Sequence, residues 1–270
     1  MLQRLIPKSG EAIPVIGLGT WQTFDVTSAA VKQRLRDVLQ RFTAAGARLL
    51  DTSPMYGRAE EVAGELAPPE VWMATKVWTR GERAGIEQME TSMRLLRRER
   101  LDLIQIHNLV DWRTHLATLR RWKEEGRVRY IGITHYTTGS FRELADIMAA
   151  EELDFVQLPL SVALPDAEKR LLPLAHDRGI AVIVNRPFEG GTLARDLRRK
   201  PLPSWAHDDY GAASWSELLL RWIVSHPAVT CVIPATGNPE HMSENLRAGE
   251  GRILTMEERE ELRRRVNAEA

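Results

Sequence analysis

The chain has very little cysteine and no excess of charge of either sign. Cys231 is the only cysteine among the 270 residues, which excludes an intramolecular disulfide and a cysteine-rich metal site. Redox chemistry would therefore need a cofactor. Lys and Arg together number 37, as do Asp and Glu, so no net charge draws the chain to nucleic acid or to a membrane surface. We expect a small-molecule ligand and a monomer or weak oligomer.

The sequence also lacks a long apolar run. Residues 1–7 contain no apolar core of the length that a signal peptide needs, and no stretch approaches the roughly 18 apolar residues of a membrane-spanning helix. A cytoplasmic location is the expectation, unless a leader was removed before residue 1. The histidines show no metal-ligand spacing such as His-x-x-x-His, so no metal site is predicted.

What the chain has instead is a regular alternation of apolar runs and amphipathic segments. Eight short apolar runs predict strands at residues 15–18, 47–51, 71–76, 101–107, 129–133, 155–158, 180–185 and 230–234. Between them, apolar residues three and four apart predict helices at 29–45, 59–66, 86–96, 112–125, 140–150, 167–177 and 214–225. Such alternation forms right-handed βαβ units with a parallel sheet. Eight units without a linker predict one domain over residues 1–270, an α/β protein with the (β/α)8 TIM-barrel fold.

Two segments lie outside this repeat. Residues 4–7 and 12–15 flank a Ser-Gly turn and predict a β-hairpin, which we expect to plug the amino-terminal end of the barrel. Residues 185–213 follow the seventh predicted strand and contain Gly190, Gly191 and three prolines. Segments of this length without regular structure are usually functional, so we expect a flap over a ligand.

Reactive side chains stand where the predicted strands stop. Asp51, Lys76 and His107 each end an apolar run, and Tyr56 follows in the segment LLDTSPMY. Taken singly, Asp51 and Tyr56 also fit turn or loop positions, and His107 fits a buried structural histidine. The carboxyl ends of barrel strands open into one mouth, however, so we expect an acid, a cation, a phenol and an imidazole to converge there.

Six motifs occur in order along essentially the whole chain: residues 17–21 (GLGTW), 51–57 (DTSPMYG), 74–78 (ATKVW), 102–107 (DLIQIH), 130–133 (YIGI) and 233–245 (IPATGNPEHMSEN). In this order they resemble the aldo-keto reductase family. The resemblance implies a TIM barrel that binds NADP(H) in an extended form and reduces an aldehyde or ketone. It also implies a catalytic tetrad of Asp51, Tyr56, Lys76 and His107. No Gly-x-Gly-x-x-Gly fingerprint of a Rossmann domain opens a helix here, which agrees with this family.

Carbonyl reduction explains why these residue types occur together. Hydride addition leaves negative charge on the carbonyl oxygen, which a nearby proton donor must meet, and Tyr56 is the expected acid. A free phenol titrates near pH 10, so we expect Lys76, at about 4–6 Å, to lower the pKa of Tyr56. Asp51 would hold Lys76 and keep it charged. His107 would orient the carbonyl or share the proton.

Contacts with the nicotinamide end follow from the resemblance. Gln157 matches the glutamine that binds the carboxamide, and Thr134 and His135 stand where the family usually has Ser-Asn. The other expected contacts on this side of the barrel mouth are Gly19, Thr20, Trp21 and Asp51.

The segment after the seventh predicted strand departs from the family pattern. Many members have an aromatic residue here that stacks on nicotinamide, and this ring is missing at the matching position. Arg186 is a candidate for covering the nicotinamide or contacting the pyrophosphate, and Gly190 and Gly191 offer backbone N–H groups to phosphate. The remaining expected contacts in this segment are Asn185, Pro187 and Phe188.

The adenosine end departs further. Where NADPH-specific members place a lysine, a serine and an arginine around the 2′-phosphate, this chain has Ala235, Thr236 and His241. A charge-assisted hydrogen bond contributes about 1.5–3 kcal/mol, so the loss of two cations predicts a weakened preference for NADP(H), or dual use with NAD(H). The other expected contacts at this end are Pro234, Asn238, Glu244 and Asn245.

The substrate pocket is expected to have aromatic walls, because three of the eight tryptophans follow predicted strands. Its expected residues are Trp21, Trp78, Asn108 and Trp112. Two other functions stay open. Lys76 at a strand end could form a Schiff base in a lyase of the aldolase kind, and a regulatory barrel could bind nicotinamide without turnover.

Overall fold

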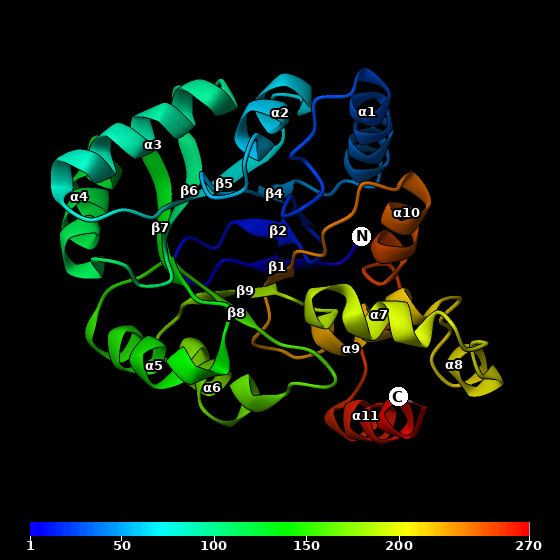
Figure 1. Cartoon of the computed structure of the whole chain (residues 1–270). Helices are drawn as coiled ribbons and strands as arrows, with labels where there is room; N and C mark the ends of the chain where they lie inside the picture. The colour runs from blue at the N-terminus through cyan, green and yellow to red at the C-terminus, as the bar shows by residue number, and fades with distance from the viewer. Residues whose placement is uncertain (270) are drawn as a thin grey trace.

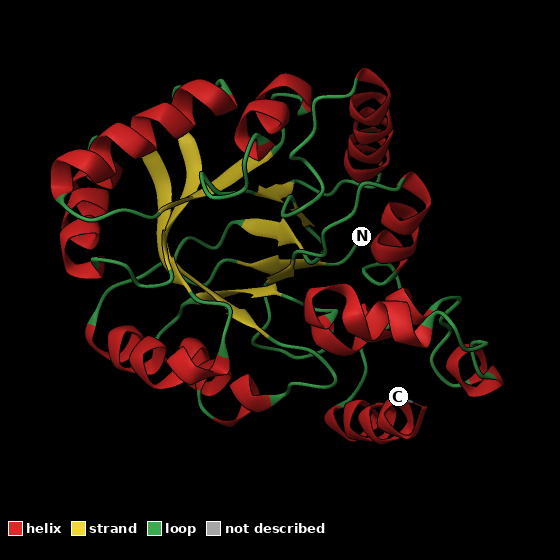
Figure 2. Ribbon diagram, in the orientation of Figure 1, coloured by secondary structure: helices red, strands yellow, loops and turns green. Residues whose placement is uncertain are grey.

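Eight parallel strands form a barrel in the computed structural model, which describes residues 1–269 (Figures 1 and 2). Around the barrel the strands are β3 (Leu18–Gly19), β4 (Leu49–Asp51), β5 (Trp72–Val77), β6 (Leu101–His107), β7 (Val128–Thr134), β8 (Phe155–Pro159), β9 (Ala181–Asn185) and β10 (Cys231–Val232). Parallel bridges from Ile16 to Val232 and from Gly19 to Ala235 join the first strand to the last. The predicted (β/α)8 fold is confirmed.

The two strands at this seam are shorter than the apolar runs that predicted them. A Cβ at Gly17 would lie 2.8 Å from the Leu49 carbonyl oxygen and 2.9 Å from the Ile233 side chain. Only glycine therefore fits where the first strand passes between its neighbours. The backbone N–H of Gly17 still donates to the Val232 carbonyl oxygen at 2.8 Å, so the seam stays hydrogen-bonded outside the assigned strands.

Helices surround the barrel, and all seven predicted helices occur (Figure 2). They are α1 (Ala29–Ala44), α2 (Ala59–Leu66), α3 (Glu82–Leu96), α4 (Trp112–Glu124), α5 (Phe141–Ala150), α6 (Leu171–Asp177) and α9 (Trp215–Val224). In α1 the buried residues are Leu35, Val38, Leu39 and Phe42, the three- and four-residue spacing of one helix face. α6 begins later than predicted, because residues 166–169 form a separate 3-10 turn.

An amino-terminal hairpin fills one end of the barrel, as predicted. β1 (Gln3–Leu5) pairs antiparallel with β2 (Ala12–Pro14). Ile6 and Ile13 are fully buried and belong to a cluster with residues from inside the barrel, including Phe155. Tyr130 on β7 donates its hydroxyl to Glu11 Oε2 at 2.6 Å, so polar contacts at the rim hold the apolar plug in place.

Several elements near the carboxyl end were not predicted from the sequence. Residues 185–213, expected to be a flap without regular structure, contain α7 (Thr192–Leu197) and α8 (Ser204–Asp208). Beyond α10 (Pro239–Arg247) lies α11 (Met256–Glu269). Arg259 of α11 is buried and donates to the Trp222 carbonyl oxygen at 2.9 Å and to Glu168 at 2.5 Å, which ties α11 to the barrel. No helix within residues 1–269 has the length and apolarity needed to cross a membrane.

Candidate active site

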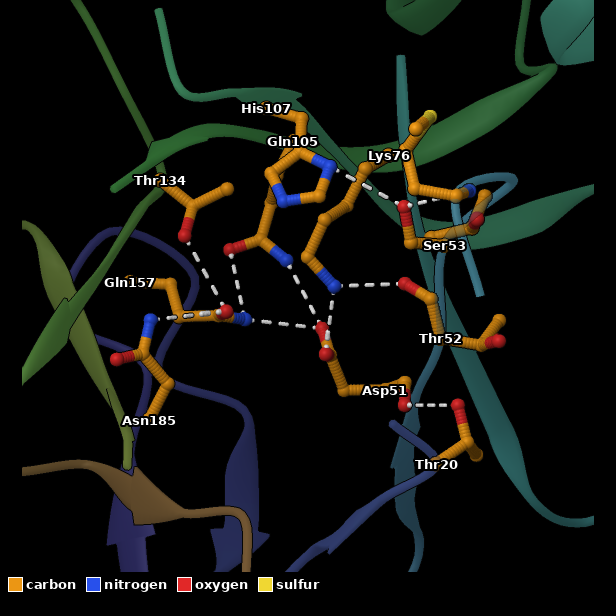
Figure 3. A network of polar contacts seen from close by, with 12 residues as sticks. Thr20, Asp51, Thr52, Ser53, Lys76, Gln105, His107, Thr134, Gln157 and Asn185 are labelled. Carbon is orange, nitrogen blue, oxygen red and sulfur yellow. Dashed lines mark hydrogen bonds and ion pairs between the residues drawn. The ribbon is translucent and has the colours of Figure 1, made fainter. Parts of the chain in front are cut away.

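Neighbouring strands deliver three of the four predicted catalytic residues, Asp51, Lys76 and His107, to one end of the barrel (Figure 3). Asp51 ends β4, Lys76 lies one residue before the end of β5, and His107 ends β6. The chain turns after β4, where the Tyr56 N–H donates to the Ser53 carbonyl oxygen at 3.0 Å. Asp51, Tyr56 and His107 line one cavity of about 470 Å³, and the Lys76 ammonium lies 5.2 Å from the centroid of the Tyr56 ring.

A buried ion pair fixes the cation. Lys76 Nζ lies 2.6 Å from Asp51 Oδ2 and also donates to the Thr52 carbonyl oxygen at 2.6 Å, and Lys76 and Asp51 are only 1% and 2% exposed. Burial by itself would lower the pKa of Lys76, but attraction to Asp51 and Tyr56 outweighs it, so the pKa is raised. Lys76 therefore keeps its charge and its position.

Two glutamines hold the carboxylate of this pair. Gln105 Nε2 and Gln157 Nε2 donate to Asp51 Oδ1 at 3.1 and 2.9 Å. Gln105 was not among the predicted site residues. Its position two residues before His107 on β6 places it on the inner face with His107, and this alternation is the signal that identifies it.

The surroundings of Tyr56 shift its pKa in opposing directions. Burial raises the pKa and Lys76 lowers it, and the net result is a pKa above the ordinary value. Lys76 acts in the predicted direction, but the net pKa of Tyr56 is not lowered as expected, because desolvation of the phenol is the larger effect. A raised pKa keeps the phenol protonated at neutral pH, which is the form that a proton donor needs.

His107 stands edge-on to Tyr56, with ring centroids 6.1 Å apart and an interplanar angle of 88°. Burial, together with the positive charge of Lys76, lowers the pKa of His107 to about 3, so the ring is neutral at physiological pH. A neutral imidazole can donate a hydrogen bond from one nitrogen and accept at the other.

Ser53, which was not predicted as a site residue, is the hydrogen-bond partner of His107 Nδ1. Its hydroxyl lies 3.2 Å from His107 Nδ1 and accepts the Met55 N–H at 3.2 Å. Donation of the hydroxyl proton to Nδ1 would place the ring proton of His107 on Nε2. Ser53 lies between Asp51 and Tyr56 in the motif DTSPMY, but nothing in the sequence shows that its side chain turns toward β6.

A second polar cluster continues from Asp51 along the strand ends. Gln157 accepts at Oε1 from Thr134 Oγ1 at 3.2 Å and from Asn185 Nδ2 at 3.3 Å. Thr134, Gln157 and Asn185 all line the 470 Å³ cavity, and their roles as cofactor contacts stay a prediction. Figure 3 shows this cluster joined to Asp51 through Gln157.

His135 departs from its predicted role. Its Nδ1 accepts the Tyr136 N–H at 3.0 Å, and its Nε2 lies 2.9 Å from Ser140 Oγ. Both ring nitrogens are thus used within the loop, and the residue is absent from the lining of the described cavities. Tyr136, which was not predicted, lines the 470 Å³ cavity and stacks on His135 with centroids 5.5 Å apart.

Most of the other predicted contacts line the same cavity. They are Gly19, Thr20, Trp21, Trp78, Asn108, Arg186, Pro187, Phe188, Gly190, Gly191 and Ala235. The wall also contains residues that were not predicted, namely Gln22, Thr23, Met55 and Ile233. Trp21, Met55 and Trp78 are partly exposed there, so the mouth has the apolar surface expected of a substrate pocket.

Several predicted residues lie outside the lining of both described cavities. Trp112 packs against the hydrophobic core and the Arg113 guanidinium, because it begins α4 and faces the helical layer. The Pro234 carbonyl oxygen accepts the Gly19 N–H at the barrel seam. Asn238 caps α10 by accepting the Glu240 N–H at 2.9 Å. Glu244 is paired with Arg198 at 3.4 Å.

A second cavity of about 360 Å³ adjoins the first, because Phe188, Gly191 and Ala235 line both. It contains four of the residues predicted for the adenosine end, Ala235, Thr236, His241 and Asn245, together with Ala194, Arg195, Arg198 and Arg199. The three arginines were not predicted as site residues, because a run of charged residues on a helix is usually a solvated face.

The two cavities together fit an extended nicotinamide dinucleotide. Three residues that line the cavities have a buried side-chain oxygen without a hydrogen-bond partner among the described residues: Asn108 Oδ1 and Asn185 Oδ1 in the first cavity, and Asn245 Oδ1 in the second. Such atoms cost free energy unless a ligand pairs with them, and the carboxamide and the adenine both offer N–H donors. Gly190 and Gly191 have φ of 68° and 94°, and a Cβ on Gly191 would meet nothing within 4 Å. The backbone there leaves room for phosphate.

Comparison with known proteins identifies the family. The profile of the aldo/keto reductase family matches residues 15–265. This chain belongs to that family. The resemblance deduced from the six motifs is confirmed, and so is the predicted oxidoreductase class.

Similar reductases match almost the whole of this aldo/keto reductase. A protein of Mycobacterium sp. (strain KMS) named aldo-keto reductase is 31% identical over 254 residues, covering 87% of this chain and 83% of its own. The methylglyoxal reductase YeaE of Escherichia coli (strain K12) is 26% identical over 258 residues, covering 91% and 89%. An aldo-keto reductase of Klebsiella pneumoniae, crystallised in complex with NADPH, superposes with a TM-score of 0.83 at 26% identity, covering 98% and 96%.

The described residues, 1–269, contain no group of three or more His, Cys, Asp or Glu side chains placed to hold a metal ion. Lys76 and Asp51 form the buried ion pair next to Tyr56. Lys76 acts on the pKa of both Tyr56 and His107, and Asp51 acts on that of Tyr56.

Proposed function

We propose that this aldo/keto reductase reduces an aldehyde or ketone to an alcohol with NADP(H), and that Tyr56 donates the proton. One observation carries the proposal. The protonated phenol of Tyr56 lines the cavity, 5.2 Å from the buried Lys76 ammonium and edge-on to a neutral His107. This is an acid, a fixed cation and a hydrogen-bond donor around the place where a carbonyl oxygen would gain charge.

The roles of the residues follow from their chemistry. When bound, the reduced nicotinamide supplies a hydride to the carbonyl carbon. Tyr56 donates its hydroxyl proton to the carbonyl oxygen, and Lys76 stabilises the phenolate that is left. His107, protonated at Nε2, donates a hydrogen bond to the same oxygen. Asp51 keeps Lys76 charged and in place.

The proposed cofactor is supported by the cavities and by similar structures. The Klebsiella pneumoniae aldo-keto reductase has been crystallised with NADPH and with NADP and acetate. In this chain Thr134, Gln157 and Asn185 would hold the carboxamide. Gly190 and Gly191 would offer N–H groups to the pyrophosphate, and Asn245 in the second cavity would accept from the adenine.

The Schiff-base lyase is disfavoured by the state of Lys76. A nucleophilic lysine must lose its proton and be reachable by substrate. Lys76 is 1% exposed, pairs with Asp51 at 2.6 Å and has a raised pKa. The same pair suits a lysine that acts as a permanent charge. A regulatory barrel that binds nicotinamide without turnover would have the same cofactor-binding residues, so only an activity assay distinguishes it from the proposed reductase.

We also propose that residues 1–270 form one domain, and that the protein is cytoplasmic and monomeric or weakly associating. The barrel with its helices accounts for residues 1–269 as one set of packed layers. The buried Cys231 thiol, whose pKa burial raises, suits a compartment where thiols stay reduced.

Cofactor binding and turnover should be measured together. NADPH and NADH are titrated against tryptophan fluorescence, and a panel of aldehydes is then added while the absorbance of the reduced cofactor is followed. Tyr56→Phe should lower kcat by at least about 10²-fold and leave cofactor affinity nearly unchanged, because general acid catalysis contributes 10²–10⁴-fold. Unchanged kcat in the variant would remove Tyr56 as the acid. Binding without turnover of any aldehyde would favour the regulatory barrel.

A further inference from the structure

We propose that three arginines at the end of α7 bind the 2′-phosphate of NADP(H) and give this reductase a preference for NADP(H) over NAD(H). Arg195 lies in α7, and Arg198 and Arg199 follow it directly. Because the cofactor belongs to the catalytic site, this phosphate site depends on the proposed function being correct.

The arginines reach the adenosine end from the side opposite the expected residues. Arg195, Arg198 and Arg199 line the 360 Å³ cavity together with Thr236, His241 and Asn245. Thr236 precedes α10, His241 and Asn245 lie on it, and Figure 1 shows α7 beside α10 and α9. Two segments separated by some forty positions in the chain thus face one space, one of them rich in cations.

The α10 side of this cavity carries no positive charge. Ala235 is apolar, and the Thr236 hydroxyl already accepts the Asn238 N–H at 3.1 Å. Burial, with the nearby charge of Arg198, lowers the pKa of His241 below its ordinary value, so its imidazole is neutral at physiological pH. A dianionic phosphate in this cavity would therefore obtain its counter-charge from the α7 side.

The guanidinium groups are largely free to take a ligand. Arg195 has only a long 3.9 Å contact with Asp196, and its side chain is 64% exposed. No ion pair is described for Arg199 within residues 1–269. Arg198 is held by Ser216 Oγ at 2.9 Å and by Glu244 at 3.4 Å, longer than the 2.7–2.9 Å of a strong charged hydrogen bond. Planar guanidinium donors match phosphate oxygens well.

NADP(H) carries a pyrophosphate and a 2′-phosphate on the adenosine ribose, and their positions along the cofactor decide which of them would meet the arginines. The pyrophosphate lies between the nicotinamide and the adenosine, so it belongs near Gly190 and Gly191, at the border of the two cavities. The arginines line only the second cavity. The ribose phosphate, which NAD(H) lacks, is the group that would lie there.

The test compares two nucleotides that differ only in this phosphate. Dissociation constants for NADPH and NADH are measured by tryptophan fluorescence for the full-length wild type and for Arg195→Gln/Arg199→Gln. The double variant should bind NADPH about 10- to 100-fold more weakly, the equivalent of one charged hydrogen bond, while NADH affinity changes by less than about 2-fold. Lys200→Gln is the matched control: it removes the next positive charge along the chain, which lies outside the cavity lining, and should leave both affinities within about 2-fold.

Each remaining outcome overturns part of the assignment. An equal loss for NADPH and NADH would place the arginines on the pyrophosphate, and no loss for either would remove them from the site. If the wild type binds neither nucleotide, the proposed function itself fails. If the wild type binds both and only the differential loss is missing, the proposed function stands and the phosphate assignment alone is wrong.

Discussion

Acidification should destabilise the fold in part through His107, the neutral imidazole beside Tyr56. In the folded chain its pKa is lowered from 6.5 to about 3, chiefly by burial. Between these values the unfolded chain binds a proton that the folded chain does not. Stability from this group is therefore fully present above about pH 6.5 and is lost as pH falls toward about 3.

The size of the loss follows from the two pKa values. One unit corresponds to 1.36 kcal/mol, so between about pH 7 and about pH 4.5 the proton taken up by the unfolded chain at His107 should cost on the order of 2.5 kcal/mol of folding free energy. His226, whose pKa burial lowers to about 4, adds a second loss in the same direction. A variant must therefore be compared with the wild type at both pH values.

Urea unfolding of the wild type and of His107→Gln at these two pH values measures the effect. Glutamine does not titrate, so the variant should lose about 2.5 kcal/mol less than the wild type on acidification. His207→Gln, which replaces a histidine whose side chain is 77% exposed, is the matched control and should keep the wild-type difference. If His107→Gln and the wild type lose the same free energy within about 0.5 kcal/mol, His107 is not held neutral in the folded state.

Two further variants test the network around His107. Asp51→Asn should cost about 3–5 kcal/mol of unfolding free energy by urea titration, because it leaves the Lys76 ammonium buried without its partner. The double variant Asp51→Asn/Lys76→Met should recover most of this loss. A loss below about 1 kcal/mol in the single variant would mean that Lys76 is not a buried charge. Ser53→Ala should lower kcat by up to about 10-fold, since one hydrogen bond contributes about 0.5–1.5 kcal/mol. It should also change the imidazole ¹⁵N NMR signature of the His107 tautomer, and Ser53→Thr should restore both. An unchanged NMR signature would show that Ser53 does not set the tautomer.

The sequence predicts the barrel because the physics of each element is local. A buried parallel strand reads as an apolar run, and β6 shows this in Leu101–His107. A helix that covers the barrel shows its buried face at three- and four-residue spacing, as in α1. The convergence of the candidate catalytic residues is also predictable, because the end of an apolar run marks the mouth of a barrel. Asp51, Lys76 and His107 come together for this reason alone.

The side chains that were missed or misplaced depend on contacts between segments. His135 follows β7, as a cofactor contact should, yet its ring turns into its own loop, where it binds Tyr136 N–H and Ser140. Arg198 lies in a charged run, and only the packing of α7 near α10 brings it to a cavity. Arg259 is buried because α11 folds back onto Trp222 and Glu168. The spacing of apolar residues within one segment does not show which other segment will pack against it.

The hydrogen-bond network joins the buried ion pair to the expected cofactor contacts. Lys76 is useful only while it is charged, and its charge depends on Asp51. Asp51 in turn accepts from Gln157, and Gln157 Oε1 accepts from Thr134 and Asn185, the expected carboxamide contacts. A donor on the cofactor that pairs with the free Asn185 oxygen would tighten the same chain of contacts that fixes the cation. The residues that would bind the nicotinamide thus belong to the same hydrogen-bond network that holds the Lys76 ammonium near Tyr56.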